Sequence, residues 1–411
     1  MSYEAYATRV VESGILSDPW LDGQPRLRQE PLLLSHSEQR TLYRAAEAMV
    51  AVYDELCRIV ADEPTLLDSF FALTPCQKAM WHSSQPLWHG IARADLFMTA
   101  EGPVLAELNC DTPTGEAEAV VQSRLAALEH AGGARDPNVE LGPRFCALLA
   151  TLSQRLPEPD PARVVGLVYP TEFTEDLPLV RLYRQWLSTR GYTVVLGSPY
   201  NLAQTEAGLS LFGQRVPLLL RHYKTDWWGE RGSVWSDEEI PDPEPLIEPL
   251  AALLNAAAEG QAAVVNPLAA VVPQNKRSMA FMWEHIHRFS PQAQATIQRY
   301  LPVTSRLEVL HAELLVAERA DWVLKSDYGA EGEEVIIGRL VTDELFRNCL
   351  EKARPGRWIA QRYFEALENS QRESVNYGVY LVAGQASGLY ARAQVGATDG
   401  NALSVPTLIV D

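Results

Sequence analysis

Residues 103–119 constrain the fold of this chain more than any other segment. They begin as a short apolar strand that ends in Glu107 and Asn109. Because side chains alternate along a strand, these two lie on the same side of it. A carboxylate and an amide oxygen side by side are hard ligands that suit Mg²⁺. The sequence Asp-Thr-Pro-Thr-Gly follows; it predicts a tight turn and adds the hydroxyl groups of Thr112 and Thr114.

A second polar pair precedes this strand. Arg93 and Asp95 stand in the sequence Ile-Ala-Arg-Ala-Asp-Leu-Phe, where alternation places them on one face of a predicted neighbouring strand. Asp95, Glu107 and Asn109 then predict an oxygen-rich metal site beside the cation of Arg93. Such a site suits phosphoryl transfer to a carboxylate. A polar strand end before a turn can also be purely structural, but lysine motifs further along the chain favour a nucleotide site.

Two lysines carry those later motifs. Lys325 ends an apolar strand, and a segment containing Gly329 and Gly332 separates it from the next strand. A lysine facing such a hairpin can hold phosphate oxygens by its charge, while backbone N–H groups add donors; the alternative is an ordinary turn. Lys276 precedes a helix predicted over residues 279–287, where its charge and free N–H groups could hold one anion. A solvated lysine is the alternative there.

Three acids, Glu172, Glu175 and Asp176, follow a buried strand predicted over residues 164–169 and begin a helix. Negative charge in the first turn of a helix is favourable by itself, which is a structural explanation for these acids. A further strand predicted over residues 192–196 completes a β-α-β unit. The unit contains no Gly-x-Gly-x-x-Gly sequence, so we predict no dinucleotide site in it.

These motifs together resemble the signature of the glutathionylspermidine synthase family, which are ATP-grasp ligases that join a carboxylate to an amine. The resemblance covers most of residues 75–411 and indicates the family but no particular substrate. It rests on Arg93-x-Asp95, Glu107-x-Asn109-x-Asp111-Thr112-Pro113-Thr114, Asn275-Lys276, Trp322-Val-Leu-Lys325, Gly329-x-Glu331-Gly332, Trp358-Ile-Ala-Gln361 and Gly378-Val-Tyr followed by Arg392, in this order along the chain.

The resemblance implies an α/β ATP-grasp fold in permuted order, because the Glu-x-Asn strand precedes the lysine strands. Permutation requires chain ends that lie close together, so we expect the terminal strand over residues 406–411 near the metal cluster. Proline-rich stretches suggest three parts. Residues 1–155 hold an N-terminal helical region, opened by a capping box at Ser35, and the metal-binding strands. Residues 156–262 form a Rossmann-like βαβ sub-domain of the pre-ATP-grasp type, and residues 263–411 hold the lysine strands, a lid hairpin and the C-terminal core.

The resemblance also implies roles for the residues. Mg²⁺ would be held by Asp95, Glu107 and Asn109, and ATP by Lys276, Lys325, Gly329, Gly332 and Gln361. The transferred phosphoryl group and the acyl phosphate would meet Arg93, Arg392, Thr112 and Thr114. The amine would be bound by Glu172, Glu175 and Asp176, because the family places its polyamine-binding acids in a comparable loop.

Three departures from the family pattern leave alternatives open. Ala330 replaces a usual basic residue of the hairpin, and Ala393 and Gln394 replace a usual acid and serine after Arg392. These changes would suit a non-catalytic nucleotide- or peptide-binding protein on the same fold. A small-molecule kinase on this fold is a further alternative to the ligase.

The composition limits the partners. A net charge of −18 argues against nucleic acid, which requires clustered Lys and Arg, and it suits a cationic substrate. No signal peptide or apolar run of membrane-spanning length is evident, and the five cysteines are scattered. We therefore expect a cytoplasmic monomer or homodimer that acts on a small-molecule carboxylate and an amine, without nucleic-acid or membrane partners.

Overall fold

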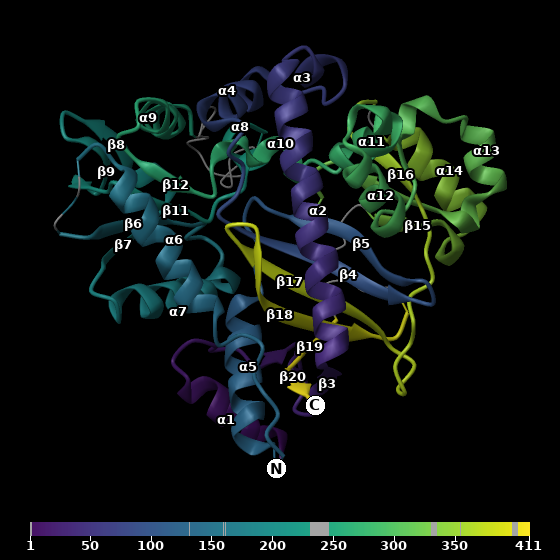
Figure 1. The fold of residues 1–411 in the computed structure, drawn as a ribbon, viewed down its shortest axis with the longest axis horizontal. Helices are drawn as coiled ribbons and strands as arrows, with labels where there is room; N and C mark the ends of the chain where they lie inside the picture. The colour runs from purple at the N-terminus through teal and green to yellow at the C-terminus, as the bar shows by residue number, and fades with distance from the viewer. Residues whose placement is uncertain are drawn as a thin grey trace.

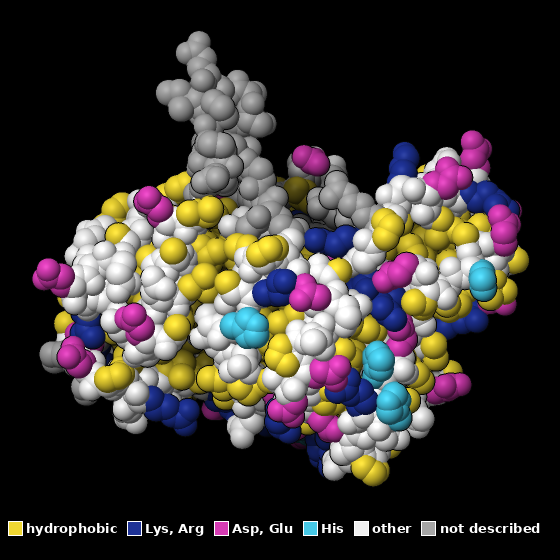
Figure 2. Space-filling model, turned by 90° about the horizontal axis from the view of Figure 1, so that it is seen from above, with side chains coloured by type: hydrophobic (Ala, Val, Ile, Leu, Met, Phe, Trp, Pro, Cys, Tyr) yellow, Lys and Arg dark blue, Asp and Glu magenta, His cyan; other side chains and the backbone are white. Residues whose placement is uncertain are grey.

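A computed structural model describes residues 2–130, 132–158, 160, 162–230, 246–329, 335–353, 355–396 and 402–411. The predicted hairpin residues Ala330 and Gly332 lie outside these described residues. The three sheets of four or five strands lie side by side with their helices (Figure 1). Within the described residues, no helix is long and apolar enough to cross a membrane. On the face drawn in Figure 2, the described acidic and basic side chains are interspersed rather than gathered into one basic surface.

The central sheet joins strands from the two ends of the chain. Its order is β19-β18-β17-β4-β5, and every neighbouring pair is antiparallel. The long helix α2 (His36–Asp62) crosses the sheet in Figure 1 and begins at the predicted capping box of Ser35 and Glu38. The strands of the central sheet are β4 (Ile91–Thr99), β5 (Gly102–Asn109), β17 (Ser374–Val382), β18 (Gln385–Gln394) and β19 (Leu403–Val405).

The second sheet is parallel, with the order β12-β11-β6-β7, and it confirms the predicted Rossmann-like unit. Its strands read as short runs of Val and Leu, as expected where both faces are covered. The strand β12 lies wholly beyond the predicted boundary at residue 262, so this sheet extends into the part predicted over residues 263–411. The elements are α6 (Leu141–Arg155), β6 (Val164–Val168), α7 (Leu177–Ser188), β7 (Thr193–Gly197), β8 (Leu202–Thr205), β9 (Gly208–Leu211), β10 (Gln214–Arg215), β11 (Leu218–Arg221), α8 (Thr225–Glu230), α9 (Ile247–Ala258) and β12 (Ala263–Val265).

The third sheet, of order β13-β16-β14-β15, is antiparallel and carries the predicted strand of Lys325 at its centre. The helix predicted over residues 279–287 begins two residues earlier and ends at Glu284. The elements are α10 (Val271–Gln274), α11 (Arg277–Glu284), α12 (Pro291–Tyr300), β13 (Thr304–Arg306), α13 (Ala312–Ala317), β14 (Trp322–Ser326), β15 (Val335–Ile337), α14 (Asp343–Lys352) and β16 (Trp358–Arg362).

The two ends of the chain lie together at the foot of Figure 1. The last strand, β20 (Thr407–Val410), pairs in parallel with β3 (Leu32–Ser35) and not with the strands that carry the oxygen cluster. The expectation that this strand lies beside the cluster is therefore wrong, because β20 leaves the sheet after β19, at the edge opposite β5. The remaining elements are α1 (Tyr3–Glu12), β1 (Trp20–Leu21), β2 (Gln24–Pro25), α3 (Leu66–Ser69), α4 (Pro75–Ser84) and α5 (Glu116–Glu129).

One hydrophobic core extends through all three predicted parts of the chain. It includes Leu105 of the central sheet, Leu219 of the parallel sheet and Phe281 of α11, all essentially inaccessible to solvent. A shared core of this kind holds the three sheets at fixed relative positions. The surfaces that the sheets present to one another therefore form a defined site.

Candidate active site

A cavity of about 1380 Å³ lies between the three sheets. Asp95 and Glu107 line it from the central sheet, His222 from the end of β11, and Lys325 from β14. Its volume exceeds the roughly 300–1000 Å³ of pockets for drug-sized ligands. The cavity is therefore large enough for a nucleotide and two further reactants.

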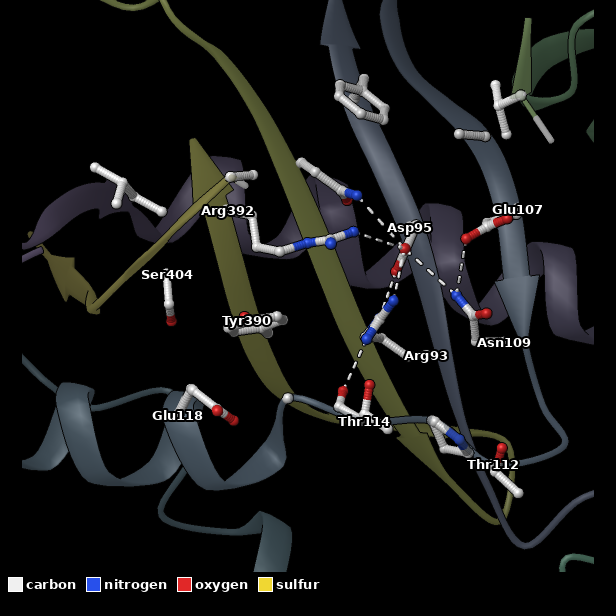
Figure 3. A pocket seen from close by; sticks show the side chains of 18 of the residues that line it. Arg93, Asp95, Glu107, Asn109, Thr112, Thr114, Glu118, Tyr390, Arg392 and Ser404 are labelled. Carbon is white, nitrogen blue, oxygen red and sulfur yellow. Dashed lines mark hydrogen bonds and ion pairs between the residues drawn. The ribbon is translucent and has the colours of Figure 1, made fainter. Parts of the chain in front are cut away.

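The predicted oxygen cluster forms on β4 and β5. Their pairing sets Asp95 opposite Glu107 and Arg93 opposite Asn109. Arg93 binds Asp95 through two hydrogen bonds of 2.6 and 2.8 Å, and the Asn109 amide lies 3.4 Å from Asp95 and 3.3 Å from Glu107 (Figure 3). On the neighbouring strand, a Cβ atom at Gly378 would lie 2.8 Å from the Arg93 side chain. Glycine there leaves room for this arginine.

The cluster offers two carboxylates and one amide as possible ligands for a metal ion. The described residues contain no group of three or more His, Cys, Asp and Glu side chains arranged to hold a metal. Mg²⁺ commonly takes only one or two protein carboxylates and completes its shell with phosphate oxygens and water. Asp95 is already held by Arg93 through two hydrogen bonds, whereas Glu107 and the Asn109 side-chain oxygen are the freer ligands. The residues thus fit a Mg²⁺ ion that a bound phosphate chain shares.

The lysine strands reach this cluster. Lys325 Nζ donates to the backbone oxygen of Ala106, at 3.1 Å, and to Gln361 Oε1, at 2.8 Å. Burial lowers the pKa of Lys325 to about 8, although Glu107 opposes the shift. Burial raises the pKa of Glu107, but Lys276 and Lys325 outweigh it and lower that pKa to about 2. The lysines and the cluster therefore interact electrostatically, and their proximity agrees with what the family resemblance implies.

Two predicted ATP-binding residues have other contacts in this structure. Lys276 lies 3.5 Å from Glu107 and donates to the backbone oxygen of Gly329, but it does not line the cavity. The Gln361 side chain accepts from Lys325 and donates to Thr304 at 3.0 Å. Gln361 therefore orients Lys325, and its side chain is not free to read a base.

The turn after β5 forms the floor of the cavity, which both Thr112 and Thr114 line. The backbone oxygen of Thr114 accepts from Arg93 and from the Tyr380 hydroxyl, each at 2.8 Å. Gly115 has a φ of +90°, and a Cβ atom there would lie 2.6 Å from the Tyr390 ring. Only glycine fits this combination of backbone angle and close packing.

Arg392 projects from β18 toward Asp95, at a distance of 3.8 Å, and lines the cavity (Figure 3). The next residue, Ala393, is buried on the opposite face of the strand against Val375 and Val405. An acid at position 393 would therefore point away from the cavity. This departure from the family pattern removes no group from the site.

The loop that carries Glu172, Glu175 and Asp176 reaches the cavity with only two of these three acids. Glu175 and Asp176 line it, but Glu172 does not, so its predicted role as a substrate ligand is not supported by its position. Glu172 is exposed in the turn before the short 3₁₀ helix Thr174–Asp176, which carries the other two acids inward. Asp176 is bound to His222, with 3.1 Å between Oδ1 and Nε2.

Sequence reasoning missed several contacts that build this site. Arg221, which is fully buried, binds Asp111 at 2.5 Å and fastens the parallel sheet to the turn after β5. Asn266 accepts from the backbone N–H groups of residues 90 and 91 and donates to three backbone oxygens at the ends of β4 and β5. Arg26 and Glu118, an ion pair of 2.5 Å, also line the cavity. In the sequence, the one feature that could have indicated these contacts is the charge of Arg221 directly after a run of leucines, which places a cation at the end of a buried strand.

The three sheets and their cavity define an α/β protein of the ATP-grasp type, with its strands in permuted order. Residues 238–410 match the family model described as glutathionylspermidine synthase pre-ATP-grasp, which confirms the resemblance seen in the motifs. No curated protein sequence matches the chain.

Solved structures share the architecture at low sequence identity. A glutathione synthetase-like effector from Globodera pallida, in its apo form, is 9% identical with a TM-score of 0.60 and covers 99% of this chain and 96% of its own. A suggested gamma-glutamylcysteine synthetase from Methylobacillus flagellatus is 14% identical with a TM-score of 0.49, and the match covers 92% of this chain and 88% of that protein. The first of these shows the shared fold.

Proposed function

We propose that this protein is an ATP- and Mg²⁺-dependent ligase that joins a carboxylate to an amine through an acyl phosphate. The observation that carries the proposal is the contact of Lys325 with the Ala106 backbone, directly beside Glu107. This contact brings the lysine that would bind phosphate and the strand that would bind the metal into one cavity. The acid would be a peptide such as glutathione or an amino acid, and the amine a polyamine or an amino acid.

The nucleotide would lie between the central and third sheets. Apolar side chains, among them Val323, Ile337 and Phe364, line that part of the cavity and suit an adenine ring. Lys325 stands at its inner end and would meet the phosphates. Bound Mg²⁺, held by Glu107 and Asn109, would supply neutralisation of the charge that develops on the transferred phosphoryl group.

The two arginines would have different tasks. Arg93 is fixed by Asp95 and by the Thr114 backbone, so it holds the cluster in shape. Arg392 makes only a longer ion pair with Asp95 and faces the cavity, so it is the freer cation for phosphoryl oxygens. The carboxylate oxygen of the acid would attack the γ-phosphorus beside Thr112, and the amine would then displace phosphate from the acyl carbon. Exclusion of water would be needed to protect the acyl phosphate until the amine reacts with it.

The position of Ala393 bears on the non-catalytic alternative. Because this residue faces away from the cavity, one of the changes that suggest a binding-only protein leaves the site intact. An experiment can distinguish a kinase from the ligase. A kinase would transfer the γ-phosphoryl group of ATP to the acid without any need for an amine.

Phosphate release from Mg-ATP tests the proposal, with acids and amines supplied singly and in pairs. We expect release only when both are present, and its loss in Lys325→Ala. The matched control is Lys352→Ala, which removes an exposed lysine at the end of α14 and should leave the rate unchanged. Transfer to the acid alone would identify a kinase, and nucleotide binding without turnover by any pair would contradict the ligase.

A further inference from the structure

His222 occupies the carboxyl end of β11, where the parallel sheet opens onto the cavity. Its backbone N–H donates to Val168 at 2.7 Å and fixes the residue to β6, and its side chain lines the cavity. Nε2 lies 3.1 Å from Asp176 Oδ1. A carboxylate only accepts, so the proton of this pair belongs to Nε2 and the lone pair of the neutral ring to Nδ1. Among the described residues, Nδ1 has no hydrogen-bond partner.

The residues around His222 tie it to the turn that would hold the acyl group. Arg221, immediately before it, binds Asp111 Oδ1 at 2.5 Å, and the Thr225 backbone N–H, shortly after it, binds Asp111 Oδ2 at 2.7 Å. Asp111 directly precedes Thr112. The histidine therefore stands at the same wall of the cavity as this turn, held from both sides.

An amine substrate requires a base at this point. Aliphatic amines are largely protonated at neutral pH, and an ammonium group has no lone pair to attack with. Among the described residues, charged groups on this side of the cavity besides Asp111 and Asp176 include Glu175, Lys224 and Asp226. Lys224 is a cation that lies over the Trp227 ring at 4.8 Å, and carboxylates are weak bases. Imidazole has the basicity that proton transfer near neutral pH needs.

We propose that His222 is the general base that activates the amine, with Asp176 as the positioning residue that fixes its tautomer and stabilises the imidazolium. This inference rests on the proposed ligase function. Nδ1 takes one proton from the ammonium group, and the nitrogen lone pair then forms the bond to the acyl carbon. The carbon–oxygen bond to phosphate breaks, phosphate leaves with the electron pair and with the second proton of the nitrogen, and the imidazolium releases its proton to water.

Hydroxylamine separates this role from the earlier phosphoryl transfer. It is largely uncharged at neutral pH, so it captures an acyl phosphate as a hydroxamate without help from a base. We therefore compare hydroxamate and amide formation in the wild type, His222→Gln and Asp176→Asn. His311→Gln, which changes an exposed histidine, is the matched control.

His222→Gln should form hydroxamate at the normal rate but lose amide formation by about 10²–10⁴-fold at pH 7, the usual contribution of general-base catalysis. The loss should shrink as pH rises and the free amine accumulates. Asp176→Asn should lose less and show the same pH trend. Normal amide formation in His222→Gln, or an equal loss of both products, would overturn the base assignment. Absence of hydroxamate from the wild type would instead contradict the ligase itself.

Discussion

Replacement of Asp111 by Asn should destabilise the protein strongly. The change leaves the charge of Arg221 buried without its carboxylate, and loss of one partner from a buried ion pair costs about 3–5 kcal/mol. Arg221 is fully buried, but it also donates to the backbone oxygens of Tyr223, Asn266 and Pro267. These acceptors still partly satisfy the guanidinium, so we expect about 3 kcal/mol, the lower end of that range.

Urea unfolding followed by tryptophan fluorescence measures this loss. The matched control is Asp68→Asn, which breaks an exposed pair with Lys78 at 2.7 Å and should change the free energy of unfolding far less. A loss below about 1 kcal/mol for Asp111→Asn would refute the reasoning, because it would mean that Arg221 reaches water in solution.

Three further predictions concern the cavity. The pKa of Lys325 is lowered to about 8, so its charge is lost as pH rises through that value. The affinity for MgATP should therefore fall above pH 8, and binding near pH 8–9 should take up a proton. Calorimetry in two buffers of different ionisation enthalpy would detect this proton uptake. Gln361→Leu removes an acceptor from Lys325 and should raise the KM for ATP about tenfold, since a hydrogen bond to a charged group contributes about 1.5–3 kcal/mol; an unchanged KM would argue against this positioning role. Gly115→Ala forces Cβ against Tyr390 at a φ of +90° and should lower the free energy of unfolding by about 2 kcal/mol, whereas an unchanged urea midpoint would show that the turn can relax.

The parts of the fold that depend on local sequence were predictable. The capping box of Ser35 and Glu38 fixes the start of α2, and runs of Val and Leu mark the strands of the parallel sheet. Strand pairing over long separations has no such local signal. The pairing of β20 with β3 could not be read from either segment, because each is a short apolar strand that many partners would satisfy.

The candidate site divides in the same way. Arg93, Asp95, Glu107 and Asn109 follow from alternation along two strands that are adjacent in the sequence. The approach of Lys325 followed only from the family resemblance, because the distance along the chain is large. Other contacts depend on how separate parts of the chain pack, which no local sequence pattern encodes. Examples are the contact of His222 with Asp176 and the ion pair of Arg26 with Glu118 at the cavity.

The acyl phosphate is the central claim, and oxygen-18 in the carboxylate of the acid substrate tests it most directly. With an acid and amine pair that supports turnover, mass spectrometry of the released phosphate should find one labelled oxygen per phosphate, because the carboxylate oxygen that attacks the γ-phosphorus leaves with it. Phosphate without label would contradict the mechanism, since the carboxylate would then never have been phosphorylated.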